Sequence, residues 1–311
     1  MMARPVLSAL PVAPPAAGKR RRPPPPGQQL VAHTVTTPQG LRVYRATHPV
    51  GTAPQARSLV LGLHGGGGDA RRFAQRSGLS EALGALGHGI VFPQARSYWA
   101  DGRPAIESGW PDDRALVETL VRQAAGSGLG AVPLALVGAS NGGMFAQRLA
   151  CEMTPPPRAV VAVTAALPAA YAAQAPAGLP VPVMLVQATE DAMMPWQGGA
   201  VPQVSGHCIA GRLLSADATV AFWCRRNRCE TAPRLRHATI SGVPVEISVW
   251  SAGPGGADVW RVVLRGAGHG WLGRKPGAGL HGSLEELVAR FLLWYLDRAR
   301  LTSTEPQENL E

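Results

Sequence analysis

The chain has 311 residues, of which 46% are hydrophobic, so it is long enough to bury a sizeable core. Its 30 Lys and Arg against 20 Asp and Glu give a formal net charge of +10, but the arginines are spread along the chain, and we expect no nucleic-acid partner. Its apolar runs are far shorter than the roughly 20 residues that a membrane-spanning helix needs, so no membrane anchor is expected.

The first 30 residues are rich in proline and contain a basic cluster at 19–22, a composition typical of a disordered tail. Arg4 and the apolar residues after it imitate a secretory signal, but prolines interrupt the stretch that should be continuous. We predict a tail over 1–30, a catalytic domain over 31–301 and a polar, acidic tail over 302–311.

Two strands joined by a turn are predicted first, over 31–36 and 41–45. Short apolar runs then alternate with helical stretches. The runs are bounded by Gly, Pro and polar residues, as buried strands of a parallel sheet are, and cover 58–63, 89–92, 134–137, 160–163, 181–186 and 259–264. Helices are predicted between them, at 79–86, 113–125, 142–152 and 216–227. This alternation predicts a doubly wound, mainly parallel α/β sheet flanked by helices.

The C-terminal third departs from this alternation. Residues 238–250 predict an added strand pair that turns around Gly242. A terminal helix is predicted over 283–300, because Ser283 and Glu286 form a capping box and apolar side chains recur on one face.

The strongest chemical signal is the sequence Gly-Ala-Ser-Asn-Gly at residues 138–142. It follows a predicted strand and precedes a helix, the setting in which a G-x-S-x-G motif presents a nucleophilic serine on a sharp turn. Small neighbours are needed because the turn is strained and other chain segments pass close by. The setting predicts the α/β-hydrolase fold with Ser140 as nucleophile.

A serine hydroxyl needs a base, and the base needs a carboxylate that fixes its tautomer. In this fold they follow in the order serine, carboxylate, histidine, on loops after strands. Asp191 follows the strand at 181–186 and is preferred to its neighbour Glu190. His269 lies between two glycines after the last predicted strand. We therefore predict a catalytic triad of Ser140, Asp191 and His269.

The third requirement is a pair of backbone donors for the oxyanion. His64 and the glycines at 65–68 follow the strand at 58–63, where an H-G-G-G type of oxyanion loop belongs. We predict the N–H groups of Gly66 and Asn141 as the oxyanion hole, with His64 holding the loop by a hydrogen bond. A phosphate cradle is excluded because no G-K-[ST] follows these glycines.

The link at 164–182 is rich in Ala and Pro and too short for a large lid, so the mouth of the site is predicted to be open. Trp110, Trp196 and Trp271 are predicted to line the substrate cleft. For Tyr98 and Trp99, a place in the cleft and a place in the core are equally compatible with the sequence.

Four cysteines are present. Cys224 and Cys229 are close enough to close a small disulfide loop, whereas Cys151 and Cys208 have no obvious partner, and the sequence leaves the connectivity open. The C-x4-C spacing without a second ligand pair argues against a metal site. The predicted chemistry requires no metal and no cofactor.

Several stretches together resemble the polyhydroxybutyrate depolymerase-like esterases, a family that includes feruloyl and acetylxylan esterases. They are Leu-His-Gly at 63–65, Asp-Asp at 112–113, the serine motif with residues 143–144 and 148–152, Thr-Glu-Asp at 189–191 with Pro-Trp at 195–196, and Gly-His-Gly-Trp at 268–271. The resemblance covers residues 58–294 and places Ser140, Asp191 and His269 at the triad positions. It implies ester hydrolysis without a cofactor, often by secreted proteins, and so favours an extracellular or periplasmic location.

Two departures from that family shape the expected substrate. The sequence lacks the separate substrate-binding domain of depolymerases that attack crystalline polymer, and its N-terminus departs from an export signal. We therefore expect a serine-dependent carboxylic ester hydrolase for hydroxyalkanoate oligomers or other short-chain or aryl esters. The alternatives are a serine peptidase of the same fold, which usually carries an additional domain, and a non-catalytic binding protein, which would normally have lost a triad member.

Overall fold

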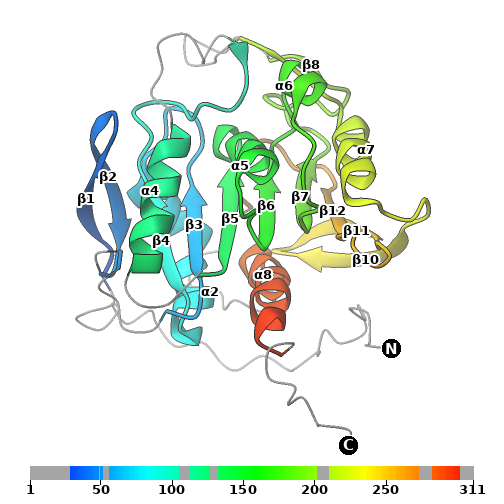
Figure 1. Cartoon of the computed structure of the whole chain (residues 1–311). Helices are drawn as coiled ribbons and strands as arrows, with labels where there is room; N and C mark the ends of the chain where they lie inside the picture. Colours follow the sequence, from blue (N-terminus) through cyan, green and yellow to red (C-terminus); the bar gives the residue numbers. More distant parts are fainter. Residues whose placement is uncertain are drawn as a thin grey trace, which may run out of the picture.

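The computed structural model describes residues 29–48, 50–51, 56–104, 113–126, 132–201, 210–272 and 282–301. The tails predicted at 1–30 and 302–311 lie almost entirely outside these residues. Within the described ranges, a large sheet carries helices on both faces (Figure 1). No helix there is both long and apolar enough to cross a membrane.

The central sheet has ten described strands. In spatial order they are β1 (Val31–Thr37), β2 (Gly40–Ala46), β4 (Gly89–Pro93), β3 (Leu59–Leu63), β5 (Leu134–Ala139), β6 (Ala159–Val163), β7 (Val183–Ala188), β12 (Val259–Leu264), β11 (Val243–Trp250) and β10 (Arg234–Ile240). The strands from β4 to β12 in this order run parallel, and antiparallel hairpins close both edges. The predicted doubly wound, mainly parallel sheet is confirmed. A separate short pair joins β8 (Gly199–Ala200) to β9 (Arg212–Leu213).

Burial explains why the inner strands read as unbroken apolar runs. Every residue of β3, β5, β6 and β7 is buried, because helices cover both faces of a parallel sheet. The edge strand β10 is exposed at all but its last residue and carries Arg234 and Arg236, and such charges discourage pairing with another chain.

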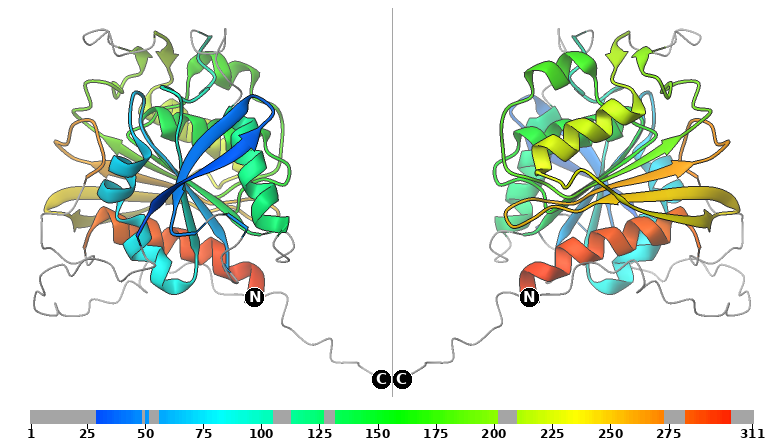
Figure 2. Two further views of the ribbon diagram at one scale, coloured as in Figure 1. Left: turned by 90° about the vertical axis from the view of Figure 1, so that its left-hand side faces the viewer. Right: turned by 90° about the vertical axis from the view of Figure 1, so that its right-hand side faces the viewer.

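Two groups of helices lie on opposite sides of the twisted sheet (Figure 2). One core contains side chains of α4 (Asp113–Gly126), α5 (Asn141–Glu152) and α7 (Ala216–Asn227). The other contains side chains of α1 (Ala70–Ser77), α2 (Leu79–Leu83) and α8 (Leu284–Leu301). Because successive strand residues point to opposite faces, Leu61 of β3 packs in the first core and Val60 in the second.

The helix predictions hold with local exceptions. The predicted helix at 79–86 is divided, because α2 ends at Leu83 and the 3-10 turn η2 (Gly84–Leu86) follows. α1 was not predicted, since its eight residues are too few for a clear apolar repeat; Asp69 begins it by accepting a hydrogen bond from the Arg72 amide at 2.9 Å. The predicted cap of α8 is present, with Ser283 Oγ accepting from the Glu286 amide at 3.2 Å.

The connection from β6 to β7 contains only the six-residue helix α6 (Ala169–Gln174). The absence of a large lid from this connection is therefore confirmed.

The disulfide that the spacing of Cys224 and Cys229 allowed is not formed, so that expectation was wrong. Both thiols are free. α7 ends between them, with Arg228 in the left-handed conformation, and Cys229 Sγ donates to the Ala257 carbonyl at 3.3 Å. Cys151 is also free and buried, and burial raises the pKa of its thiol to about 11. Cys208 lies outside the described residues.

Candidate active site

The predicted nucleophile lies on a sharp turn between β5 and α5. Ser140 has φ of +52°, a conformation that a non-glycine residue rarely adopts, and its amide donates to the Val163 carbonyl at 2.9 Å. Glycines flank it for a steric reason. A side chain on Gly138 would collide with the Gly142 carbonyl, and one on Gly142 would collide with the Leu63 carbonyl. The turn is therefore strained and closely packed, as functional turns often are.

The three residues predicted as a triad meet at the carboxyl edge of the sheet. His269 Nε2 lies 3.0 Å from Ser140 Oγ, and His269 Nδ1 lies 2.9 and 2.8 Å from the two carboxylate oxygens of Asp191. A carboxylate only accepts, so Nδ1 carries the proton and donates it to Asp191. Nε2 is then free to accept from the serine hydroxyl, which is the arrangement of a general base.

Asp191 is itself held by its own loop. Its Oδ1 accepts from the amides of Met193 and Met194 at 2.9 and 2.8 Å, and the residue is only 6% exposed. The rival Glu190 has an exposed side chain, and its amide donates to the Ala267 carbonyl at 3.0 Å. The structure therefore places Asp191 beside His269. Glu190 instead connects the loop after β7 to the loop after β12 through its backbone hydrogen bond.

The glycine loop after β3 lies against the serine turn. A Cβ on Gly65 would be 3.5 Å from Ser140 Cβ, and one on Gly66 would be 3.4 Å from Asn141 Cβ. The ring of Tyr98 covers Gly66 so closely that a side chain there would collide with it. Gly66 and Asn141, predicted from the sequence as the oxyanion donors, are thus neighbours in space.

His64 holds the glycine loop, as the sequence predicted. Its Nδ1 donates to the Gly65 carbonyl at 2.7 Å, and its Nε2 accepts from the Ala95 amide and lies 3.1 Å from Gln94 Nε2. Burial lowers the pKa of His64, so its ring is neutral near pH 7. Both ring nitrogens are occupied within the protein, which leaves neither available as a second base.

No protein-family model matches the chain. The candidate esterase NocK of Nocardia uniformis subsp. tsuyamanensis is 29% identical over 248 residues, which cover 75% of this chain and 71% of NocK. Among solved structures, acetyl xylan esterase from Aspergillus awamori has a TM-score of 0.55 at 13% identity and covers 77% of this chain and 94% of its own. Thermogutta terrifontis esterase 2 has a TM-score of 0.52 at 14% identity and covers 91% and 98%. This chain has the α/β-hydrolase fold.

The tryptophans predicted to line the substrate cleft have different surroundings. Trp196 is half-buried, and the guanidinium of Arg261 lies over its ring, 4.7 Å from the centroid. Trp271 is also half-buried and meets Phe73 edge to face, with the ring centroids 5.6 Å apart. Trp110 lies outside the described residues.

The alternative left open for Tyr98 and Trp99 is decided differently for the two residues. Trp99 is completely buried and stacks on Phe145, with the ring centroids 5.4 Å apart, so it is a core residue. Tyr98 is half-buried and packs over Gly66 at the glycine loop.

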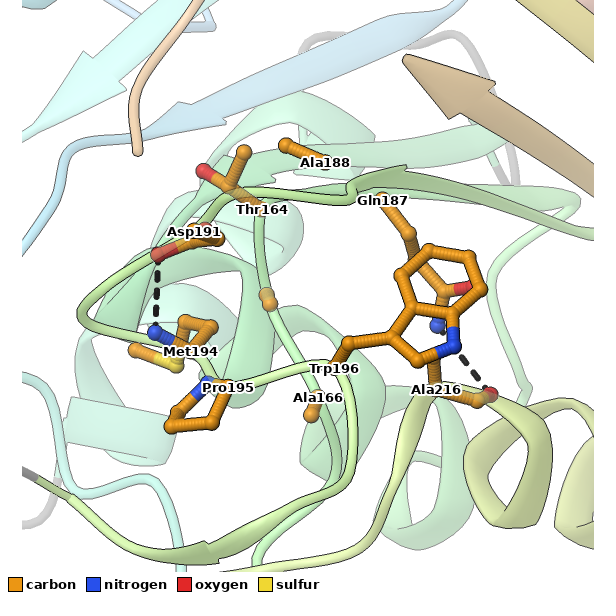
Figure 3. A pocket seen from close by; sticks show the side chains of 10 residues that line it. Thr164, Ala166, Gln187, Ala188, Asp191, Met194, Pro195, Trp196 and Ala216 are labelled. Atoms are coloured by element: carbon orange, nitrogen blue, oxygen red, sulfur yellow. Dashed lines mark hydrogen bonds between the residues drawn. The ribbon is translucent and has the colours of Figure 1, made fainter. Parts of the chain in front are cut away.

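A small pocket adjoins the loop that carries Asp191 (Figure 3). It lies between the segments after β6 and β7 and the start of α7, with Trp196 and Asp191 in its wall. Its volume of about 20 Å³ has room for one water molecule. Thr164 Oγ1 and Gln187 Oε1 border it, and both are buried without a hydrogen-bond partner in the described part of the chain. Neither residue belongs to a motif, so nothing local in the sequence marks them as part of the site.

Proposed function

We propose that this chain is a serine-dependent carboxylic ester hydrolase that works through an acyl-enzyme. The observation that carries the proposal is the line of hydrogen bonds from Ser140 through His269 to Asp191. The similarity to NocK and the esterase activity named for the solved relatives support an ester over other acyl substrates.

In the first step, Ser140 Oγ attacks the ester carbonyl carbon while His269 Nε2 takes its proton. Asp191 holds the imidazole in the productive tautomer and stabilises the positive charge that forms on it. The tetrahedral intermediate collapses when the protonated histidine gives its proton to the leaving alcohol. Ser140 is then acylated, and His269 is neutral again.

In the second step, water attacks the acyl-enzyme with His269 again as base, and the acid is released as the proton returns to Ser140. In both steps a negative charge develops on the carbonyl oxygen. We assign its stabilisation to the amides of Gly66 and Asn141, two residues that are neighbours in space. Donors that are fixed in advance need no reorganisation when this charge develops.

For the substrate, we propose hydroxyalkanoate oligomers or other short-chain or aryl esters. The connection from β6 to β7 carries only a six-residue helix and no large lid, which supports access by a chain-like substrate. Trp196 presents an aromatic ring beside the acid loop, and Trp271 follows the base by two residues, so both are proposed as walls of the cleft.

The experiment is a hydrolysis panel with p-nitrophenyl acetate, butyrate and octanoate, methyl ferulate, 3-hydroxybutyrate oligomers and a p-nitroanilide. Wild type is compared with Ser140→Ala and with Ser77→Ala, which removes a buried hydroxyl that has no hydrogen-bond partner among the described residues. We expect esterase activity in wild type and in Ser77→Ala, and its loss in Ser140→Ala. Cleavage of the anilide alone would replace the proposal by a peptidase, and no turnover by a folded wild type would replace it by a binding protein.

A further inference from the structure

The buried segment 99–103 links the two parts of the chain that carry the proposed oxyanion donors. On one side, Trp99 Nε1 donates to the His64 carbonyl at 2.8 Å, directly before the glycine loop. On the other side, the Trp99 ring stacks on Phe145 of α5 with an interplanar angle of 4°. The segment therefore fixes the distance between the glycine loop and the helix that begins after Ser140.

The side chain of Asn141 is held by this segment at three points. Its Oδ1 accepts from the Trp99 amide at 2.7 Å, and its Nδ2 donates to the Trp99 carbonyl at 3.1 Å and to Asp101 Oδ2 at 2.7 Å. Asn141 is 2% exposed, so no water competes for these bonds. The orientation of its amide group follows from them, because only an oxygen can accept from the Trp99 amide.

Asp101 has to be a carboxylate in this arrangement. Its Oδ2 accepts from Asn141 Nδ2, and its Oδ1 accepts from the Arg103 amide at 3.0 Å. The Arg103 guanidinium also donates to Asp101, with Nη2 2.7 Å from Oδ2. Both side chains are buried, at 0% and 4% exposure. A carboxylate buried to this extent is tolerated because a cation and several donors surround it.

The backbone of the segment is anchored as well. The Ala100 amide donates to Asp113 Oδ2 at 3.1 Å, and the Ala100 carbonyl accepts from Arg148 Nη1 at 3.0 Å. Gly102, with φ of +92°, leaves no room for a side chain against the ring of Tyr171. These contacts hold the segment in place, so the hydrogen bond that Asp101 accepts from Asn141 positions the asparagine rather than the carboxylate.

We propose that Asp101 is a positioning residue, which holds Asn141 so that its backbone N–H faces the oxyanion. Asn141 is the first residue of α5, and the amide of a first helical residue has no acceptor within the helix. That amide is therefore available to a substrate oxygen, and its direction depends on how residue 141 is held. The inference rests on the proposed esterase function and adds to it a residue that orients one of the two oxyanion donors.

The test uses Asp101→Ala, which removes the acceptor of Asn141 Nδ2 altogether, whereas an asparagine at 101 could keep its oxygen on Asn141 and turn its NH₂ group toward the Arg103 amide. Asp101→Ala combined with Arg103→Gln also removes the buried cation, in case the unpaired arginine prevents folding. Asp258→Ala is the matched control, because Asp258 accepts from the Ala252 amide and Tyr295 at the amino end of β12, away from Ser140.

Two readouts are measured on the folded variants: kcat and KM for the best p-nitrophenyl ester, and the rate at which a fluorophosphonate modifies Ser140, followed by peptide mass mapping. Removing one oxyanion donor lowers kcat by about 10²- to 10³-fold, so a misdirected donor is expected to lower kcat at least about tenfold with KM nearly unchanged. The fluorophosphonate rate is expected to fall by a similar factor, and Asp258→Ala is expected to behave as wild type.

A folded Asp101→Ala or double variant with wild-type kcat and wild-type labelling rate would overturn the positioning role while leaving the esterase proposal intact. An equal loss in Asp258→Ala would also overturn it, because the loss would then not depend on contact with Asn141. Absence of labelling at Ser140 in the wild type would overturn the esterase proposal, and this inference with it.

Discussion

Replacing Asp191 by asparagine tests the assignment of the triad acid at a single atom. Asp191 Oδ1 accepts from two backbone amides as well as from His269, whereas His269 is the one donor to Oδ2 within the described residues. In Asp191→Asn, the side-chain oxygen is expected to keep accepting hydrogen bonds from the Met193 and Met194 amides. The NH₂ group is then expected to face His269. His269 Nδ1 must then accept, so the ring proton moves to Nε2 and the base can no longer accept from Ser140.

The expected magnitude follows from this tautomer change. Loss of the correct tautomer in such a triad lowers kcat by about 10⁴-fold. At about 1.36 kcal/mol for each factor of ten, this is about 5.4 kcal/mol of transition-state stabilisation. The free energy of unfolding is expected to change little, because both backbone hydrogen bonds of the acid loop are retained.

The assay is steady-state hydrolysis of the best p-nitrophenyl ester, together with thermal unfolding. Glu190→Gln is the matched control, since Glu190 precedes Asp191 but its side chain is exposed. A kcat of Asp191→Asn within about tenfold of wild type would refute the argument, because the tautomer would then not depend on Asp191. A loss in Glu190→Gln as large as that in Asp191→Asn would assign the role to the neighbouring residue.

Three further predictions concern stability and the thiols. Gly142→Ala places a Cβ against the carbonyls of Leu63 and His64, and we expect it to lower the free energy of unfolding by about 1–3 kcal/mol, measured by urea unfolding. Burial lowers the pKa of His64, so the unfolded chain binds the extra proton as the pH falls below 6.5, and the wild type should lose stability there. His64→Gln should lose less between pH 7.5 and 5.5 in the same assay. Unreduced peptide mapping after denaturing alkylation should find Cys224 and Cys229 as free thiols.

Each of these has an outcome that would contradict it. Gly142→Ala unfolding at the wild-type urea concentration would mean that the turn can open away from the strand β3. An equal pH dependence in His64→Gln would mean that other groups cause it. A disulfide-linked peptide containing Cys224 and Cys229 would restore the pairing that their spacing allowed.

The fold and the positions of the triad were accessible from the sequence because they depend on local patterns in a fixed order. Buried strands gave unbroken apolar runs, and Ser140, Asp191 and His269 each follow such a run. The short helices α1 and α6 were not accessible, since eight and six residues are too few for a distinct apolar repeat.

The network around Asn141 was not accessible from the sequence for a different reason. Asp101 and Arg103 lie on a loop, belong to no motif and meet residue 141 only through the fold, 40 residues away along the chain. A charged residue on a loop is usually exposed, so nothing local marks these two as buried. Trp99 illustrates the same limit, because an aromatic residue beside a predicted site is equally compatible with cleft and core.

The most direct test of the central claim is to trap the acyl-enzyme. Wild type is mixed with p-nitrophenyl butyrate, quenched in acid within the first turnovers, digested and mapped by mass spectrometry, while p-nitrophenol release is followed in parallel. We predict a butyryl group on the peptide that contains Ser140, and its absence from the Ser140→Ala variant. Turnover with the acyl group on another residue, or unchanged turnover in Ser140→Ala, would contradict the account.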